Sequence, residues 1–136
     1  MKNILFDLIS KYNNIENGLR INIPIEDYID KLLEFSTLIT YQESQHIVGL
    51  IAYYKNDPEK KESFLTMLLI DETSRNKKIG QKLLDFALSD LINNNFKNMN
   101  LEVLKSNKRA IEFYKKNKFI IQSENGEFYK MSLCLN

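Results

Sequence analysis

The spacing of apolar residues predicts two helices at the start of the chain. In the first, apolar positions recur at helical spacing: Ile4, Leu5, Leu8, Ile9 and Tyr12. The second opens at Pro24, whose fixed φ suits a first helical turn. Glu26 and Asp27 follow it, at the end of a helix where the dipole favours acidic side chains. The polar residues between the two patterns are predicted to form a loop.

Three strands are predicted next, because the apolar runs become shorter. Residues 37–42 and 46–54 are separated by only a short polar connection, so we expect them to pair as an antiparallel hairpin. The third run, residues 64–70 (FLTMLLI), is apolar without interruption. Such a run is typical of a strand in the middle of a sheet, where both faces are covered.

The second half of the chain alternates helix and strand signals. A helical pattern covers residues 79–92, a strand pattern covers 99–104, and Ser106 or Asn107 caps a short helix after it. The chain ends in a hairpin, in which the Asn-Gly pair at 125–126 is the signal for a type I′ turn. Because we find no repeat, linker or low-complexity segment, we expect residues 1–136 to form a single α+β domain around one sheet.

Composition and charge narrow the class of protein. With 136 residues, 43% of them hydrophobic and 27% charged, the chain is typical of one globular domain. A net charge of +1 argues against a nucleic-acid or membrane-surface binder that relies on bulk positive potential. No apolar run reaches membrane-spanning length, and the single cysteine, Cys134, cannot form an internal disulfide. We therefore expect a cytoplasmic protein with neither nucleic acid nor membrane as a partner.

One stretch carries a chemical signal: residues 74–84 (SRNKKIGQKLL) lie between a predicted strand and a predicted helix. The first backbone N–H groups of a helix have no partner within it, and the helix dipole makes them attract anions. Arg75, Lys77 and Lys78 add full positive charges, and Gly80 lacks a Cβ that would collide with a bound phosphate. Neither the P-loop nor the dinucleotide glycine motif is present. A diphosphate is the natural ligand, although a solvated basic turn would have the same sequence.

Together with a second motif downstream, this stretch resembles the GNAT superfamily of acetyl-coenzyme A dependent N-acetyltransferases. The family's coenzyme pattern, Q/R-x-x-G-x-G/A, matches Arg75 and Gly80 at its first and last positions. The family's second pattern, N-x-x-A-x-x-F-Y-x-x-x-G-F, matches residues 107–119 except at its glycine. The order of strands and helices around both motifs agrees as well. The resemblance covers residues 37–128.

Three departures from the family stand out. Lys78 replaces a glycine in the first motif, so the loop has to tolerate a Cβ there. Lys118 replaces the glycine of the second motif, and we expect the neighbouring Asn117 to take the left-handed conformation at the helix end instead. The chain also begins with a helix where the family usually has its first strand.

The resemblance implies a mixed, mostly antiparallel sheet flanked by helices, with a splayed central strand pair. The resemblance also implies that the ligand of this strand pair and of the loop at 74–84 is acetyl-CoA, a cosubstrate. We expect no metal. The predicted coenzyme contacts are Leu68, Leu69, Ile70, Arg75, Asn76, Lys77, Lys78, Ile79, Gly80, Gln81, Asn107, Ala110 and Tyr114. Lys105 and Lys108 are further candidates, for the 3′-phosphate, unless they are simply exposed lysines.

The resemblance also implies the reaction, in which a primary amine of a small acceptor attacks acetyl-CoA directly and forms a tetrahedral intermediate. Backbone N–H groups of the strand at 64–70 would stabilise the oxyanion. Tyr114 matches the family's general acid, which protonates the departing thiolate. An aromatic residue at this apolar position is otherwise expected only to pack against the sheet.

The acceptor and the general base stay open at this stage. An amino sugar is one candidate acceptor, and Arg20 suits an acceptor with a carboxylate or phosphate. Asp71 and Glu72 follow the splayed strand but are not assigned as bases. We expect His46 at the surface and Cys134 as a buried apolar residue, both outside catalysis.

Two other functions are compatible with the sequence. Lys78 and Lys118 keep open a non-catalytic GNAT-fold module that binds CoA or a protein partner. A nucleic-acid binder that uses the basic turn is disfavoured by the balanced charge. The terminal hairpin, residues 120–133, leaves an exposed edge through which a homodimer could form.

Overall fold

The helices and strands follow one another in the predicted order along the chain. The computed structural model describes residues 1–15, 18–57, 59 and 61–135. Its elements are α1 (Lys2–Tyr12), α2 (Ile25–Phe35), β1 (Thr37–Glu43), β2 (His46–Tyr54), β3 (Glu62–Ile70), the 3-10 helix η1 (Glu72–Ser74), α3 (Ile79–Asn93), β4 (Asn98–Leu104), α4 (Lys108–Lys116), β5 (Ile120–Asn125) and β6 (Phe128–Cys134). None of the helices in this described part of the chain is long and apolar enough to cross a membrane.

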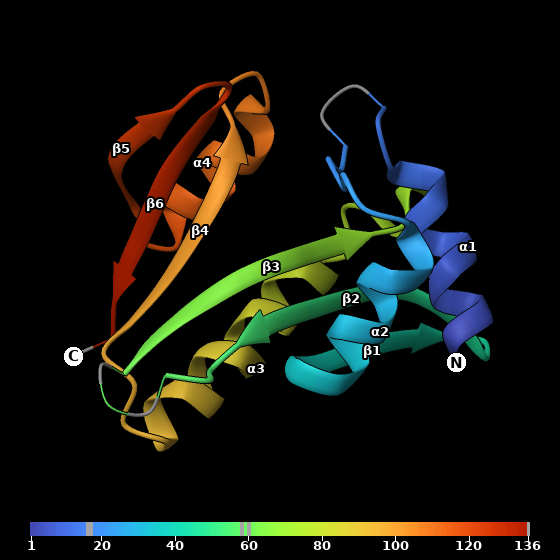
Figure 1. Ribbon diagram of the computed structural model, residues 1–136, viewed down its shortest axis with the longest axis horizontal. Helices are drawn as coiled ribbons and strands as arrows, with labels where there is room; N and C mark the ends of the chain where they lie inside the picture. Colours follow the sequence, from blue (N-terminus) through green and yellow to red (C-terminus); the bar gives the residue numbers. More distant parts are fainter. Residues whose placement is uncertain (16–17, 58, 60, 136) are drawn as a thin grey trace.

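The strands form one mixed sheet in the order β1-β2-β3-β4-β6-β5 (Figure 1). Only the pair in the middle, β3 and β4, is parallel, and the other four pairs are antiparallel. The predicted α+β class with a mostly antiparallel sheet is therefore confirmed. At one end of the sheet, every residue of β5 is exposed. Dimer formation through this edge stays a prediction.

Helices cover both faces of the middle of the sheet. In Figure 1, α1 and α2 lie in front of the sheet and α3 lies behind it. The front core packs helix residues such as Leu5 and Ile29 against Leu50 and Met67 of β2 and β3. The back core includes residues of α3, α4 and four strands: Ile51, Leu65, Leu83, Leu84, Met99, Leu101, Ile111 and Met131. Because β3 contributes to both cores, its uninterrupted apolar sequence is explained.

A β-bulge interrupts β3 at its centre. Ala52 of β2 faces Met67 and Tyr53 faces Leu65, so Thr66 has no partner of its own in β2. Leu65 packs in the back core, whereas Met67 packs in the front core. The Thr66 hydroxyl forms a 2.9 Å hydrogen bond with the hydroxyl of Tyr28 on α2. The bulge thus turns a polar residue of β3 toward the helices in front.

The predicted type I′ turn of the last hairpin is wrong. Asn125 pairs with Phe128, so the turn itself consists of Gly126 and Glu127. Of these two, only Gly126 has a positive φ, 59°. A type I′ turn requires positive φ at both central residues, and here the asparagine belongs to the strand instead.

Two predictions about single residues are also wrong. Asn117 has an ordinary φ of −90°, and Lys118 itself takes the left-handed conformation, with φ 76°. The side chain of Asn117 stabilises the ordinary conformation of that residue, because it donates a 2.9 Å hydrogen bond to the carbonyl of Phe113. Cys134 is exposed rather than buried, because it ends β6 at the rim of the sheet opposite Asn98.

Candidate functional site

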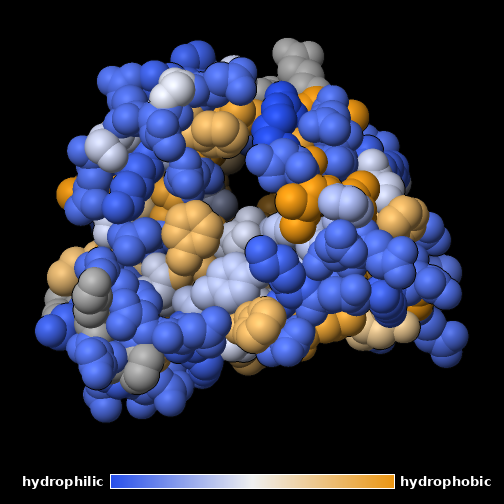
Figure 2. All heavy atoms as spheres, viewed as in Figure 1, coloured by the Kyte–Doolittle hydropathy of each residue, from blue (hydrophilic) through white to orange (hydrophobic). Residues whose placement is uncertain are grey.

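The two parallel strands in the middle of the sheet separate halfway along their length. They pair from Glu62 and Asn98 to Leu65 and Leu101, and beyond that point they diverge (Figure 1). The backbone groups of residues 66–70 that point away from β2 therefore have no neighbouring strand. Figure 2 shows that the molecule is hollowed over this opening. An extended ligand could pair with the free edge of β3 there.

The predicted residues Leu68, Leu69 and Ile70 all lie in this unpaired half of β3. Leu68 and Ile70 pack from the edge of the back core, and Leu69 is buried in the front core. Their side chains hold the strand between the two cores. Contact with a ligand in the opening would therefore come from their backbone groups.

The loop before α3 leaves the amino end of that helix open. Lys78 is the N-cap residue, and no side chain caps the helix there. The first helical hydrogen bond runs from the nitrogen of Lys82 to the carbonyl of Lys78, over 3.1 Å, so the three N–H groups in between have no helical partner. Both Asn76 and Lys78 have positive φ, 70° and 61°. Lys78 thus keeps the backbone shape that glycine adopts easily, at a cost of about 1 kcal/mol.

The basic side chains of this loop are only partly free. Lys77 lies 3.3 Å from the carboxylate of Glu43, which also accepts a hydrogen bond from Ser74. The Ser74 hydrogen bond and Lys77 lower the pKa of Glu43. The guanidinium of Arg75 lies 5.7 Å from the centre of the Tyr12 ring. Lys77 therefore fastens the loop to β1, whereas neither Arg75 nor Lys78 forms an ion pair within the described residues.

Gly80 and Gln81 stand in the first turn of α3. A Cβ on Gly80 would meet Ile70 at 3.7 Å and Phe113 at 3.9 Å, which are ordinary contacts, so protein packing does not require a glycine there. The amide of Gln81 exchanges two hydrogen bonds with that of Asn117, at 2.7 and 3.1 Å. The Gln81 side chain thus joins α3 to the end of α4, and its backbone N–H is one of the three that have no helical partner.

The start of α4 lies next to this loop. Asn107 caps α4, because its side-chain oxygen accepts a 3.2 Å hydrogen bond from the nitrogen of Ala110. Arg109, which the sequence analysis did not select, donates to the side-chain oxygen of Asn76 at 3.3 Å. Lys105 forms an ion pair with Glu124 and so points to the last hairpin. The structure therefore brings the two coenzyme motifs together.

Tyr114 lies on α4, in the back core. Only 9% of its surface is exposed, and its ring packs edge-on against Phe113 and Phe119. Burial raises the pKa of Tyr114 above its ordinary value. Within the described residues its hydroxyl has no hydrogen-bond partner. The phenol is therefore protonated at neutral pH and can donate.

Glu102 is a candidate residue that sequence reasoning missed. It is the first residue of β4 beyond the last pair with β3. Its neighbours Leu101 and Val103 are buried in the back core, whereas Glu102 is exposed and so faces the front. The alternation of the strand sequence was the signal for it. Tyr114 thus packs on the back face of the sheet, and Glu102 faces the front.

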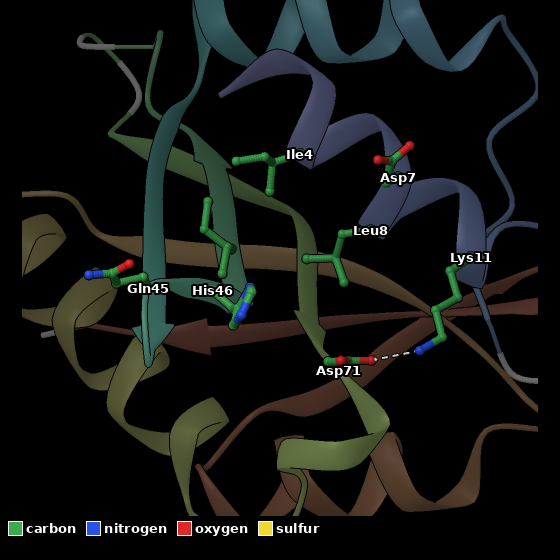
Figure 3. A pocket seen from close by; sticks show the side chains of 8 residues that line it. Ile4, Asp7, Leu8, Lys11, Gln45, His46 and Asp71 are labelled. Carbon is green, nitrogen blue, oxygen red and sulfur yellow. Dashed lines mark hydrogen bonds and ion pairs between the residues drawn. The ribbon is translucent and has the colours of Figure 1, made fainter.

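Asp71 is already engaged by its neighbours. Its carboxylate accepts hydrogen bonds from the hydroxyl of Tyr12 and, at 3.1 Å, from Lys11 (Figure 3). The Tyr12 hydrogen bond, followed by that of Lys11, lowers the pKa of Asp71. Such a carboxylate is a poor proton acceptor. It lies beside a surface hollow that is lined by α1 and by the turn at Gln45 and His46.

Residues 13–15 and 18–24, the described part of the segment between α1 and α2, lie opposite β4 and α4 across the opening in Figure 1. Arg20 donates hydrogen bonds from Nη1 to the carbonyls of Ile15 and Leu19, at 2.7 and 3.1 Å, and so stabilises this segment. Ile15 and Ile23 are exposed, at 44% and 39%. Figure 2 shows hydrophobic atoms on this side of the hollow. This side of the hollow, the front wall, therefore exposes apolar side chains beside polar ones.

Comparison with known proteins agrees with this geometry. The sequence matches the acetyltransferase (GNAT) family over residues 6–119. No curated protein matches the chain.

Solved structures share the fold at low identity. An acetyltransferase of the GNAT family from Staphylococcus aureus Mu50 has 22% identity and a TM-score of 0.82, over 99% of this chain and 93% of that one. Ard1 from Thermoplasma volcanium has 24% identity and a TM-score of 0.76, over 98% and 93%. PaiA N-acetyltransferase from Thermoplasma acidophilum, in complex with coenzyme A, has 20% identity and a TM-score of 0.71, over 81% and 69%.

Proposed function

Because the chain belongs to the acetyltransferase (GNAT) family, we propose that it transfers the acetyl group of acetyl-CoA to a primary amine. The observation that carries the proposal is the opening between β3 and β4, which ends beside the uncapped amino end of α3. The similar PaiA N-acetyltransferase, whose structure is a complex with coenzyme A, supports coenzyme A as the ligand.

The coenzyme fits the groups that the opening offers. The diphosphate would accept hydrogen bonds from the free N–H groups at the start of α3, with Arg75 and Lys78 as counter-charges. The pantetheine arm would pair with the free backbone edge of residues 66–70. An N–H group of this edge would polarise the thioester carbonyl and stabilise the oxyanion.

We assign the two proton transfers to Tyr114 and Glu102. The amine nitrogen forms a bond to the carbonyl carbon, and the carbon–sulfur bond then breaks. Tyr114 gives its proton to the departing thiolate from the back of the sheet, where burial keeps the phenol protonated. Before the attack, Glu102 takes a proton from the ammonium form of the acceptor, directly or through a water, from the front of the sheet, and the neutral amine that remains is the nucleophile. As the intermediate collapses, the nitrogen loses its second proton, which restores the phenol of Tyr114.

The front wall favours an amine that is attached to an apolar group. Ile15 and Ile23, in the segment between α1 and α2, are exposed, and burying apolar surface against such side chains stabilises a complex by about 25 cal/mol per Å². An amino sugar presents hydroxyl groups that these side chains cannot satisfy.

The proposal is tested by binding and by turnover. A ligand at about 100 times its Kd stabilises a protein by about 2.7 kcal/mol, so millimolar acetyl-CoA should raise the melting temperature by several degrees. Release of free CoA thiol is then measured with a panel of aliphatic, aromatic and sugar amines, and we expect turnover with the apolar amines. A melting temperature that does not respond to acetyl-CoA would contradict the proposal. Binding without turnover for any amine would favour a non-catalytic CoA-binding module.

A further inference from the structure

The last residue of α1, Tyr12, contacts the start of the loop that leads to α3. Its ring is buried, with 3% of its surface exposed. Its hydroxyl donates to the carboxylate of Asp71 and accepts a 2.8 Å hydrogen bond from the backbone nitrogen of Glu72. Both partners directly follow β3. One hydroxyl group therefore fixes how the chain leaves the splayed strand.

Two cations reinforce this contact. Lys11 lies 3.1 Å from the same carboxylate oxygen of Asp71 (Figure 3). The guanidinium of Arg75 lies over the ring of Tyr12. Arg75 belongs to the proposed diphosphate site, so a phosphate that binds Arg75 acts on a side chain in contact with Tyr12.

The end of α1 also forms hydrogen bonds with the segment that follows it. The carbonyl of Tyr12 accepts a 2.8 Å hydrogen bond from the nitrogen of Leu19. The side-chain oxygen of the next residue, Asn13, accepts one from the nitrogen of Ile21 at 3.0 Å. Leu19 and Ile21 belong to the segment that forms the front wall. The side chain of Tyr12 thus contacts the loop that leads to α3, and its backbone carbonyl binds the segment that forms the front wall.

We propose that Tyr12 is a positioning residue that couples coenzyme binding to the order of residues 18–23. This inference rests on the proposed function. Bound coenzyme fixes the loop before α3, and the contact between Tyr12 and Asp71 fixes the end of α1 with it. The hydrogen bonds to Leu19 and Ile21 then open less often. By linkage, the acceptor binds more tightly to the coenzyme complex than to the free protein.

Amide hydrogen exchange, with CoA as the probe, tests this coupling. In the wild type we expect CoA to slow exchange at residues 78–82, which would contact it, and at Leu19 and Ile21. In Tyr12→Phe the ring stays and the hydroxyl is lost. We expect protection at 78–82 to persist and protection at the two distant amides to fall about fivefold, the effect of one hydrogen bond of ordinary net strength. Tyr41→Phe, a hydroxyl deletion on β1, should behave as the wild type.

A conservative pair of variants separates coupling from simple loosening. Asp71→Asn keeps an oxygen that accepts the Tyr12 hydroxyl and should retain the distant protection, whereas Asp71→Ala should lose it. Unchanged protection of Leu19 and Ile21 in Tyr12→Phe would overturn the inference, as would protection at 78–82 alone in the wild type. Absence of protection at 78–82 in the wild type would overturn the proposed function and the coupling together.

Discussion

Arg109, in the first turn of α4, donates a 3.3 Å hydrogen bond to the side-chain oxygen of Asn76, in the loop before α3. The contact joins the amino ends of the two helices that flank the proposed diphosphate site. Asn76 has a positive φ of 70°, which is typical of a tight turn. The side-chain oxygen that accepts the hydrogen bond therefore belongs to a sharply turned loop. Both side chains are exposed, and a neutral partner binds a guanidinium less strongly than an anion does.

We predict that Arg109 exchanges Asn76 for a phosphate of bound acetyl-CoA. Arg109→Ala should raise the Kd for acetyl-CoA about tenfold, the effect of one charge-assisted hydrogen bond. Calorimetric titration measures this change. Lys108→Ala, which removes a charge from the neighbouring residue, is the control and should weaken binding less. Equal effects of the two variants would show that Arg109 contributes only general positive potential.

Tyr114→Phe should lower kcat by about a hundredfold or more, because it removes the proton donor for the thiolate. The ring contacts with Phe113 and Phe119 are kept, so the free energy of unfolding and the Kd for acetyl-CoA should change little. Steady-state kinetics with the best amine of the panel measures the loss. Tyr41→Phe controls for removal of a hydroxyl elsewhere. A variant with wild-type kcat would leave Tyr114 with a packing role alone.

Glu102→Gln should lower kcat/KM by about ten- to a hundredfold at neutral pH, because the attacking amine then loses its proton without a base. The deficit should shrink at high pH, where solvent already deprotonates the amine. The pH profile of kcat/KM is the measurement. Glu62→Gln, in the paired half of β3, is the matched control and should follow the wild-type profile. A uniform loss at every pH would indicate a structural role for Glu102.

The architecture could be predicted from the sequence because its signals are local. The helical stripe of 79–92 and the uninterrupted run at 64–70 each reflect burial of one element, and the structure has both where they were expected. The separation of β3 from β4 came from the family resemblance, since no local pattern encodes where two strands stop pairing.

The side-chain contacts around the candidate site could not be predicted, because they join segments that are distant in the sequence. Tyr12 and Asp71 are 59 positions apart, and Arg109 and Asn76 are 33 apart, so neither pair leaves a trace in periodicity. Asn117 was expected to be left-handed because asparagine tolerates that conformation. Its side chain instead bonds to Gln81 and Phe113, and this tertiary contact outweighs the intrinsic preference.

Lys78→Gly should raise the free energy of unfolding by about 1 kcal/mol, because it removes the cost of a Cβ at a φ of 61°. Lys118→Gly, at a φ of 76°, should act similarly. Urea unfolding measures both. Lys115→Gly, inside α4, is the control and should lower stability by about 1 kcal/mol. Destabilisation by Lys78→Gly would mean that the lysine side chain has a stabilising contact that outweighs its strained backbone.

Stability should fall as the pH is lowered below about 5, the range in which unfolded carboxylates begin to bind protons. The pKa of Asp71 is lowered by Tyr12 and Lys11, and that of Glu43 by Ser74 and Lys77. For Asp90, burial acts to raise the pKa, but Lys55 and Tyr53 together outweigh it. A carboxyl whose pKa is lower in the folded protein stabilises it above the unfolded pKa. That contribution disappears as the pH falls through the folded pKa.

Asp71→Asn should therefore flatten the dependence of the free energy of unfolding on pH between about 5 and 2, because the variant has no proton to bind at this position. Urea unfolding at a series of pH values gives the slope. Tyr12→Phe should flatten it partly, since it removes the first cause of the lowered pKa of Asp71. Tyr41→Phe serves as the control, because Tyr41 forms no hydrogen bond with Asp71 and the substitution leaves the partners of that carboxylate unchanged. If Asp71→Asn kept the wild-type slope, the acid sensitivity would have to arise from Asp90 and Glu43, and the Tyr12 hydroxyl would hold the loop without depending on the charge of its partner.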